Sequence, residues 1–313
     1  MNRLRRAMEE GRTGLNFVGA PSALFARLIE AQGCDGVYLS GAVLSQCVHG
    51  IADDGTVTLA QLADFAGTLC RATRLPVIAD ADTGFGGLRD DGAGGYAEGG
   101  DETDVALCVR TLEAAGVAGI QIEDQVPAKK CGHLDGKQLE PVEVMEAKLR
   151  SAAAARQDPA LVLIARTDAR GVTGYDDALE RARRYRAAGA DMIFIEALPD
   201  AAEFARFAAD CPGPLLANMT EFGKSPLLPR ADLAAMGYTV VIYPATLMRL
   251  MLTVAEQALH TMAADGHQKG LLDGMWSRAR LYDLIGYDHA VPDSPDTRAP
   301  DTLPPTPGAR PRE

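Results

Sequence analysis

The chain has 313 residues, of which 47% are hydrophobic and 24% are charged. These fractions are typical of a folded globular protein and exclude a disordered, collagen-like or coiled-coil chain. Its formal net charge of −12 argues against a general nucleic-acid binder, which needs clustered lysines and arginines. The sequence has neither the apolar run of about 18 residues that a membrane helix needs nor the apolar core of a signal peptide, so we expect a cytoplasmic protein without membrane contact.

Eight short apolar segments are predicted to be buried parallel strands, because each is apolar on both faces. Helical patterns separate them, and several of these helices end at a glycine that suits a left-handed cap, as at Gly33, Gly116 and Gly189. The alternation predicts an α/β protein with a (β/α)₈ TIM-type barrel. A doubly wound sheet is the alternative, but no G-x-G-x-x-G pattern follows the first strand. The predicted strands are 15–18, 36–39, 77–80, 119–122, 161–165, 192–195, 215–217 and 240–243.

Two segments do not fit this alternation. Residues 86–100 contain seven glycines and few apolar residues, which predicts a mobile loop. Residues 291–313 contain seven of the eighteen prolines, which predicts a disordered tail. The expected organisation is therefore a barrel with C-terminal helices over 1–290, followed by the tail.

Carboxylates gather where two predicted strands end, and that end of a barrel carries active sites. Asp80 and Asp82 point to the same side of one strand because side chains alternate along it, and Glu123 ends the next strand. Acids this close repel one another unless a cation lies among them, and oxygen ligands favour Mg²⁺ or Mn²⁺. The alternative is that these acids only cap helices.

One cysteine has unusual neighbours. Cys131 lies in the segment Lys129-Lys130-Cys131-Gly132-His133, and basic neighbours lower the pKa of a thiol and make it chemically useful. The alternative is a cysteine that has no role beyond packing. The other five cysteines are scattered, so we expect reduced thiols throughout.

In this order, the motifs resemble those of the isocitrate lyase and phosphoenolpyruvate mutase superfamily, and most of all the short bacterial 2-methylisocitrate lyases. The resemblance runs from about residue 15 to residue 287. The Asp-Ala-Asp and Cys-Gly-His motifs are specific when they occur together. The segments that carry the resemblance are Ser40-Gly41, Asp80-Ala81-Asp82-Thr83-Gly84-Phe85-Gly86, Glu123-Asp124-Gln125, Lys129-Lys130-Cys131-Gly132-His133, Ala165-Arg166-Thr167-Asp168 and Asn218-Met219-Thr220-Glu221-Phe222-Gly223.

The resemblance implies a (β/α)₈ enzyme that binds Mg²⁺, with Mn²⁺ as a substitute, and a homotetramer that exchanges C-terminal helices. It implies that Asp80 and Asp82 bind the metal and that Glu123 binds the metal's water molecules. Asp53 falls where the superfamily has an aspartate on a mobile loop near the site, although Ala52 replaces the usual proline before it. The implied substrate contacts are Ser40, Gly41, Ala42, Gly132, His133, Arg166, Glu196, Asn218, Met219, Thr220, Arg249 and Arg278.

The reaction implied is the cleavage of 2-methylisocitrate to pyruvate and succinate, a carbon-carbon lyase step of propionate catabolism in the methylcitrate cycle. Such a cleavage removes the hydroxyl proton and protonates the departing carbanion. We expect Cys131 to be the general acid, and Tyr38 is a candidate for the base because of its position on a strand. Arginines such as Arg166, Arg249 and Arg278 suit the substrate carboxylates.

Rival functions remain open. Lys130 stands where 2-methylisocitrate lyases usually have arginine, and this form of the motif occurs in isocitrate lyases. Against that rival, Ala42-Val43 follows Ser40-Gly41 where isocitrate lyases have a tryptophan, which leaves room for a methyl group on the substrate. Lyases of substituted malates are a further alternative. A non-catalytic barrel that binds a dicarboxylate is the most distant one.

Overall fold

The computed structural model describes every residue except 1, 86–87, 91–95, 99–101, 127–131 and 288–313. The chain divides into two compact units, Met1–Leu250 and Met251–Glu313. The predicted boundary at residue 290, between the barrel with its C-terminal helices and the tail, stays a prediction. The predicted disordered tail, 291–313, lies outside the described residues.

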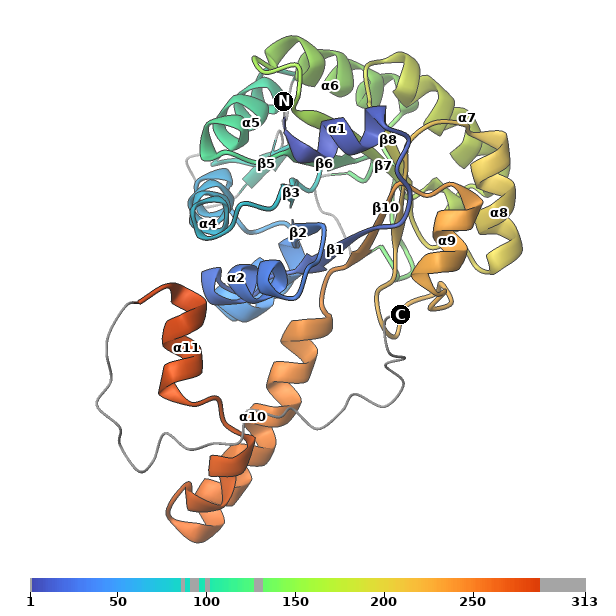
Figure 1. Cartoon of the computed structure of the whole chain (residues 1–313). Coiled ribbons are helices and arrows are strands. Elements are labelled where there is room, and N and C mark those ends of the chain that lie inside the picture. The colour runs from blue at the N-terminus through green and yellow to red at the C-terminus, as the bar shows by residue number, and fades with distance from the viewer. Residues whose placement is uncertain (1, 86–87, 91–95, 99–101, 127–131, 288–313) are drawn as a thin grey trace. The chain divides into compact units, whose positions relative to one another are not determined.

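The first unit contains a closed barrel of eight parallel strands in the order β1-β10-β9-β8-β7-β6-β3-β2 (Figure 1), which confirms the predicted (β/α)₈ fold. Four strands are longer than predicted at their carboxyl ends, and in three of them backbone pairing continues into polar residues; Glu123 pairs in register with Arg166, for example. The strands are β1 (Leu15–Gly19), β2 (Gly36–Leu39), β3 (Val77–Asp80), β6 (Gly119–Glu123), β7 (Val162–Thr167), β8 (Met192–Ile195), β9 (Leu215–Asn218) and β10 (Val240–Tyr243).

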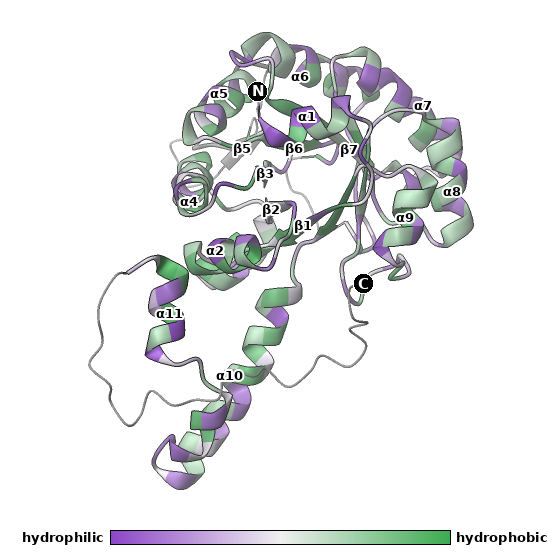
Figure 2. Cartoon of the chain, viewed as in Figure 1, coloured by the Kyte–Doolittle hydropathy of each residue, from purple (hydrophilic) through white to green (hydrophobic). Residues whose placement is uncertain are grey.

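Helices surround the barrel, and side chains at their starts often satisfy the free backbone N–H groups. Thr58 and Gln61 form a reciprocal capping box before α4, and Asp200 accepts the N–H of Glu203 before α8. Figure 2 shows apolar and polar residues on these helices. The helices of this unit are α1 (Arg3–Glu9), α2 (Ala23–Ala31), α3 (Gly41–Val43), a π-helix (Leu44–His49), α4 (Leu59–Ala72), α5 (Glu102–Ala115), α6 (Val142–Ala155), a 3₁₀ turn (Ala169–Gly171), α7 (Tyr175–Ala187), α8 (Ala201–Asp210) and α9 (Arg230–Met236).

Helix α10 (Thr246–Asp265) begins in the first unit and continues into the second. A 3₁₀ helix (Lys269–Gly274) and α11 (Arg278–Ile285) follow it. None of the described residues from 251 to 287 is buried. No helix in the described parts of the chain is both long and apolar enough to cross a membrane.

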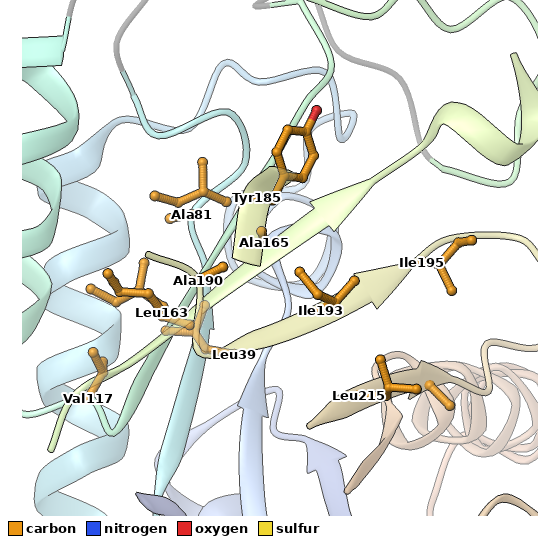
Figure 3. Close-up of a cluster of buried hydrophobic side chains, with 14 of the residues drawn as sticks. Leu39, Ala81, Val117, Leu163, Ala165, Tyr185, Ala190, Ile193, Ile195 and Leu215 are labelled. Carbon is orange, nitrogen blue, oxygen red and sulfur yellow. The ribbon is translucent and has the colours of Figure 1, made fainter. Parts of the chain in front are cut away.

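Strand alternation sorts the barrel side chains into two apolar layers. Outward residues pack against the helices, and Figure 3 labels ten residues of the cluster that they form together, including Leu163 and Ala165 of β7 and Tyr185 of α7. Inward residues form a second cluster that includes Phe17 and Ile164. Leu4 and Ala7 of α1 belong to this inner cluster, so α1 packs against the amino ends of the strands.

The glycine-rich segment has more order than the sequence predicted. β4 (Leu88–Asp90) pairs with β5 (Tyr96–Glu98) as an antiparallel ladder. The prediction of a mobile loop is therefore wrong for these six residues, because their backbones pair with one another. The remaining residues of 86–100 lie outside the described part.

A carboxylate joins α2 to the segment behind α4. Glu30 accepts hydrogen bonds from the Thr73 hydroxyl (2.6 Å) and from the backbone N–H of Arg74 (2.9 Å). The hydrogen bond from Thr73 and the bonds and charge of Arg74 outweigh the effect of burial and lower the pKa of Glu30 from 4.5 to about 2. A carboxylate with a lowered pKa stabilises the fold above its unfolded pKa, and this contribution is lost as the pH falls toward the folded pKa.

We predict that Glu30→Gln lowers the free energy of unfolding at about pH 7 and that its difference from wild type shrinks as the pH falls from about 4.5 toward 2. Urea unfolding at several pH values measures this difference. Glu9→Gln, at an exposed position of α1, is the control. A difference between Glu30→Gln and wild type that stays constant over this pH range would contradict the prediction.

Candidate active site

A cavity of ≈ 120 Å³ lies at the carboxyl ends of the barrel strands. Most of the predicted site residues line it, namely Tyr38, Ser40, Ala42, Asp53, Asp80, Gly132, His133, Arg166, Glu196, Asn218, Thr220 and Arg249. The lining also includes five residues that the sequence analysis missed, namely Gln46, Phe194, Ile242, Pro244 and Ala245. The fold therefore brings together residues from seven strands or the segments that follow them.

The other predicted residues have different positions. Gly41, Asp82, Glu123 and Met219 belong to the same end of the barrel but do not line the cavity. Arg278 lies on α11 in the second unit, so its contact with substrate stays a prediction. The predicted general acid, Cys131, lies outside the described residues, and so do Lys129 and Lys130.

Arg166 is the central cation of the cavity. Its guanidinium Nη1 lies 2.8 Å from Glu123 Oε2, and its Nε lies 2.9 Å from Asp168 Oδ2. A third carboxylate, Glu196, lies 3.6 Å from Nη2, and the Phe194 ring lies under the guanidinium at 5.4 Å. Burial alone would lower the pKa of Arg166, but the charges of these carboxylates raise it further above its ordinary value. The cavity therefore holds a permanent buried cation.

Glu196 connects Arg166 to the loop that follows Gly132. Its Oε1 lies 3.2 Å from His133 Nε2, and its Oε2 accepts a hydrogen bond of 3.1 Å from Asn218 Nδ2. Burial alone would raise the pKa of Glu196, but the charge of Arg166 and the hydrogen bond from His133 lower it well below its ordinary value. Glu196 is therefore an anion that orients its neighbours.

His133 joins two loops. Its Nδ1 accepts the backbone N–H of Lys224 (2.9 Å), so its proton belongs on Nε2, facing Glu196. The Lys224 ammonium also pairs with Asp135 at 2.5 Å. A Cβ atom on Gly223 would lie 2.6 Å from His133 Nδ1, so only glycine allows this contact. The loop after β6 and the loop after β9 are thus fixed to each other at the cavity.

Tyr38 is a hydrogen-bond donor in the barrel interior. Its hydroxyl donates to Gln121 Oε1 (2.5 Å), and Gln121 Nε2 donates to Asp80 Oδ1 (2.9 Å). Burial and the nearby negative charge of Asp80 raise the pKa of Tyr38 well above 10. The hydrogen bonds therefore link the predicted base to Asp80 through Gln121, and the role of Tyr38 as the base stays a prediction.

Asp80 and Asp82 converge on one point. The position that a Cβ on Gly41 would occupy lies 3.2 Å from Asp82 Oδ1 and 3.5 Å from Asp80 Oδ2. Both acids are buried, and two convergent carboxylates are the oxygen donors that Mg²⁺ prefers. Glu123 does not join this pair of acids at Gly41, because its carboxylate forms an ion pair with Arg166. Within the described residues, no group of three acids, histidines or cysteines is placed to hold a metal.

The backbone at this end of the barrel is strained. The non-glycine residues with positive φ in the described chain are Asp82, Phe85, Ala197 and Phe222, and each lies in a loop that follows β3, β8 or β9. Such conformations cost free energy and are retained mostly at functional sites. The strain therefore marks the same end as the cavity.

The mouth of the cavity carries a second cation. Arg249 on α10 donates from Nη1 to the backbone carbonyl of Glu221 and lies 2.7 Å from its carboxylate. The Thr246 hydroxyl bonds to the other oxygen of that carboxylate. The Asn218–Gly223 segment is therefore anchored to the start of α10, and a half-exposed guanidinium stands beside the opening.

The missed residues differ in how they could have been found. Phe194 and Ile242 point inward by strand alternation, since Phe194 lies two residues before Glu196, so the pattern of β8 already contained this signal. Gln46 reaches the cavity from a π-helix, a rare element often found at functional sites, and nothing in its local sequence marks that geometry.

The model of the phosphoenolpyruvate phosphomutase family matches residues 4–263. The chain belongs to this family. It is 47% identical over 271 residues to the probable 2-methylisocitrate lyase 1 of Corynebacterium glutamicum, covering 86% of this chain and 84% of that protein. A crystal structure of 2,3-dimethylmalate lyase aligns with a TM-score of 0.82 at 33% identity over 91% of both chains. Phosphonopyruvate hydrolase in complex with oxalate and Mg²⁺ aligns with a TM-score of 0.78 at 27% identity over 91% of this chain and 95% of that one.

We predict that Gly132→Ala destabilises the protein. A Cβ on Gly132 would lie 2.2 Å from Arg166 Nη2 and 2.7 Å from Glu196 Cγ, so it would push two buried groups apart. Such overpacking typically costs about 1–3 kcal/mol in the free energy of unfolding, measured by urea denaturation. Gly270→Ala is the control, since a Cβ there meets open space, and its effect should stay within about 0.5 kcal/mol. Equal effects of the two substitutions would contradict this prediction.

Proposed function

We propose that this family member is a Mg²⁺-dependent carbon-carbon lyase that cleaves 2-methylisocitrate to pyruvate and succinate. One observation carries the proposal: the cavity places the cations Arg166 and Arg249 together with the carboxylate of Asp80. A substrate with several carboxylates needs cations to bind it, and its hydroxyl needs a metal or a base to activate it. The identity of 47% to a probable 2-methylisocitrate lyase supports this substrate class.

Asp80 and Asp82 would hold the Mg²⁺, because their carboxylates converge beside Gly41 and the backbone of Asp82 is held in a strained conformation. Glu123 would bind the metal's water molecules rather than the metal. When bound, Mg²⁺ polarises hydroxyl and carboxylate oxygens and lowers the cost of negative charge on them. Support for this metal comes from a family member, phosphonopyruvate hydrolase, whose structure contains Mg²⁺.

The chain's own residues would bind, orient and protonate the substrate. Arg166 is oriented by three carboxylates and faces the cavity, so it would hold a substrate carboxylate without reorganising. Cys131 would be the general acid that protonates the succinate carbanion. Tyr38, which is linked to Asp80 through Gln121, would be the candidate for the base that removes the hydroxyl proton. Asp53 would act from the loop that reaches the cavity edge.

The apolar part of the cavity favours a methylated substrate. Ala42, Ala245, Phe194 and Ile242 all line it, and the two alanines leave volume that larger side chains would fill. One methyl group in such a pocket is worth about 1–3 kcal/mol, or roughly 10–200-fold in kcat/KM. Isocitrate would therefore be a slow substrate rather than an excluded one. A lyase of substituted malates is the second candidate, because the 2,3-dimethylmalate lyase structure aligns over 91% of both chains.

The C-terminal unit supports an oligomer. Leu252, Val254 and Leu259 of α10 are each more than 60% exposed. Apolar side chains that recur on an exposed helix are typical of a protein interface. We propose that they are covered in a cytoplasmic homotetramer whose subunits exchange these helices.

We predict that 2-methylisocitrate is cleaved with a kcat/KM roughly 10–200-fold above that of isocitrate. The test is a panel of 2-methylisocitrate, isocitrate and 2,3-dimethylmalate with Mg²⁺, in which release of the keto acid is followed. Ala42→Val should reduce the preference for the methylated compound, because it fills the cavity beside Ser40. Equal or faster cleavage of isocitrate would replace the proposed substrate, and release of no keto acid from any compound would favour a non-catalytic dicarboxylate-binding barrel.

We predict that substituting the general acid and substituting a metal ligand affect different quantities, kcat in the first case and Mg²⁺ affinity in the second. Cys131→Ala should reduce kcat by about 10²–10⁴ and leave Mg²⁺ affinity unchanged, since a proton-transfer group contributes that much. Asp82→Ala should weaken Mg²⁺ binding steeply, because it removes one of two convergent carboxylates. Calorimetric titration with Mg²⁺ and turnover after EDTA treatment measure the two effects. Near-normal kcat in Cys131→Ala would remove this residue from the mechanism.

A further inference from the structure

One buried cation near the cavity has no part in the proposed chemistry. The Lys137 side chain is 2% exposed, and its ammonium donates to the Gly132 carbonyl (2.5 Å) and to Asp168 Oδ1 (2.7 Å). Burying an ammonium costs several kcal/mol unless a charge and hydrogen bonds compensate it. Both acceptors belong to the cavity: Gly132 lines it, and Asp168 holds Arg166.

The backbone fixes where Lys137 starts. The loop after β6 folds back on itself, with Val126 N–H bonded to the Gln138 carbonyl and Glu140 N–H bonded to the Asp124 carbonyl. Gln125 and Leu139 form an antiparallel bridge between these bonds. This short ladder joins the loop to the end of β6 directly after Lys137, so the ammonium approaches Gly132 from a rigid base.

Asp168 lies between two cations. Arg166 Nη2 donates to its Oδ1 (3.1 Å), and Lys137 donates to the same oxygen. Without Lys137, the full charge of Asp168 would act on the guanidinium and draw it away from a ligand in the cavity. Without the ammonium, the Gly132 carbonyl would also lose its donor, and Gly132 packs directly against Arg166.

We propose that Lys137 is a positioning residue that fixes the Gly132 backbone against Arg166 and divides the charge of Asp168 between two cations. The proposal rests on the lyase function for its kinetic part only. Lys137 would contact neither the substrate nor the metal. It acts through Gly132 and Arg166, and its removal affects turnover more than global stability.

The chain offers a matched comparison at the opposite end of the barrel. Arg156 Nη1 donates to the Leu161 carbonyl (2.9 Å) and to Asp191 Oδ2 (2.6 Å). Like Lys137, Arg156 joins a backbone carbonyl to an aspartate that also pairs with a second cation, here Arg5, which donates to the Leu161 carbonyl as well. Leu161 and Asp191 precede β7 and β8, at the ends of the strands away from the cavity. A purely structural role for Lys137 predicts similar behaviour of the two sites.

The test compares Lys137→Met with Arg156→Met in the full-length chain. Three quantities are measured: the melting temperature, kcat and KM with 2-methylisocitrate and saturating Mg²⁺, and hydrogen exchange of peptides covering 132–136 and 219–224. We expect Lys137→Met to lower kcat/KM about 10²-fold, with a clear loss in kcat, because small misplacements of positioning groups have effects of that size. Both peptides should exchange faster, since His133 and Lys224 join them. Arg156→Met should keep kcat and both exchange rates close to wild type.

Lys137→Gln keeps a hydrogen-bond donor but loses the charge, so its kcat should fall between those of wild type and Lys137→Met. If Lys137→Met does not fold, Lys137→Gln is the variant that tests the proposal. A kcat within about threefold of wild type in the variant that folds, or unchanged exchange of 132–136, would overturn the proposal. If the wild type cleaves no 2-methylisocitrate, the lyase proposal fails on its own. The exchange measurement then still decides whether Lys137 positions this loop.

Discussion

A guanidinium inside a barrel needs counter-charges, and the ion pairs of Arg166 set the arrangement of the whole site. Burial of an unpaired cation would be prohibitive, so β6, β7 and β8 each contribute an acid at their carboxyl ends or just beyond. These acids would repel one another without Arg166. The cation and the acids therefore require each other, and His133, Asn218 and Lys137 are held by the acids in turn.

Strand alternation makes this cluster possible. Inward positions near the amino ends are apolar, and α1 packs against them. Two residues further along the same strands, inward positions become polar: Ile164 is followed by Arg166, and Phe194 by Glu196. The apolar layer beneath lowers the local dielectric, which strengthens the ion pairs above it. The same residue spacing therefore produces both the core and the charged site.

Much of this could be predicted from the sequence, because strands buried on both faces have a distinct pattern. All eight strands of the barrel were predicted, and most errors in their bounds fell at carboxyl ends, where polar residues such as Glu123 continue the ladder. The ion-pair and hydrogen-bond partners of the site side chains could not be predicted from the sequence. Glu123 forms an ion pair with Arg166, and Gln121 joins Tyr38 to Asp80, through contacts between residues far apart in the chain. Lys137 in a polar loop likewise had no local signal, because only the return of that loop onto β6 buries it.

The two sides of the cavity differ in how freely they can change. On one side, Arg166, Glu196 and His133 are linked through ion pairs and hydrogen bonds, so replacing one disturbs the rest. On the other side, Ala42, Gln46 and Ala245 line the cavity outside that network, on helices or loops. Substrate preference in such a fold can therefore change through substitutions on the second side, while the charged residues of the first side stay the same. Laboratory evolution aimed at bulkier or shorter acids has its natural starting library at these three positions.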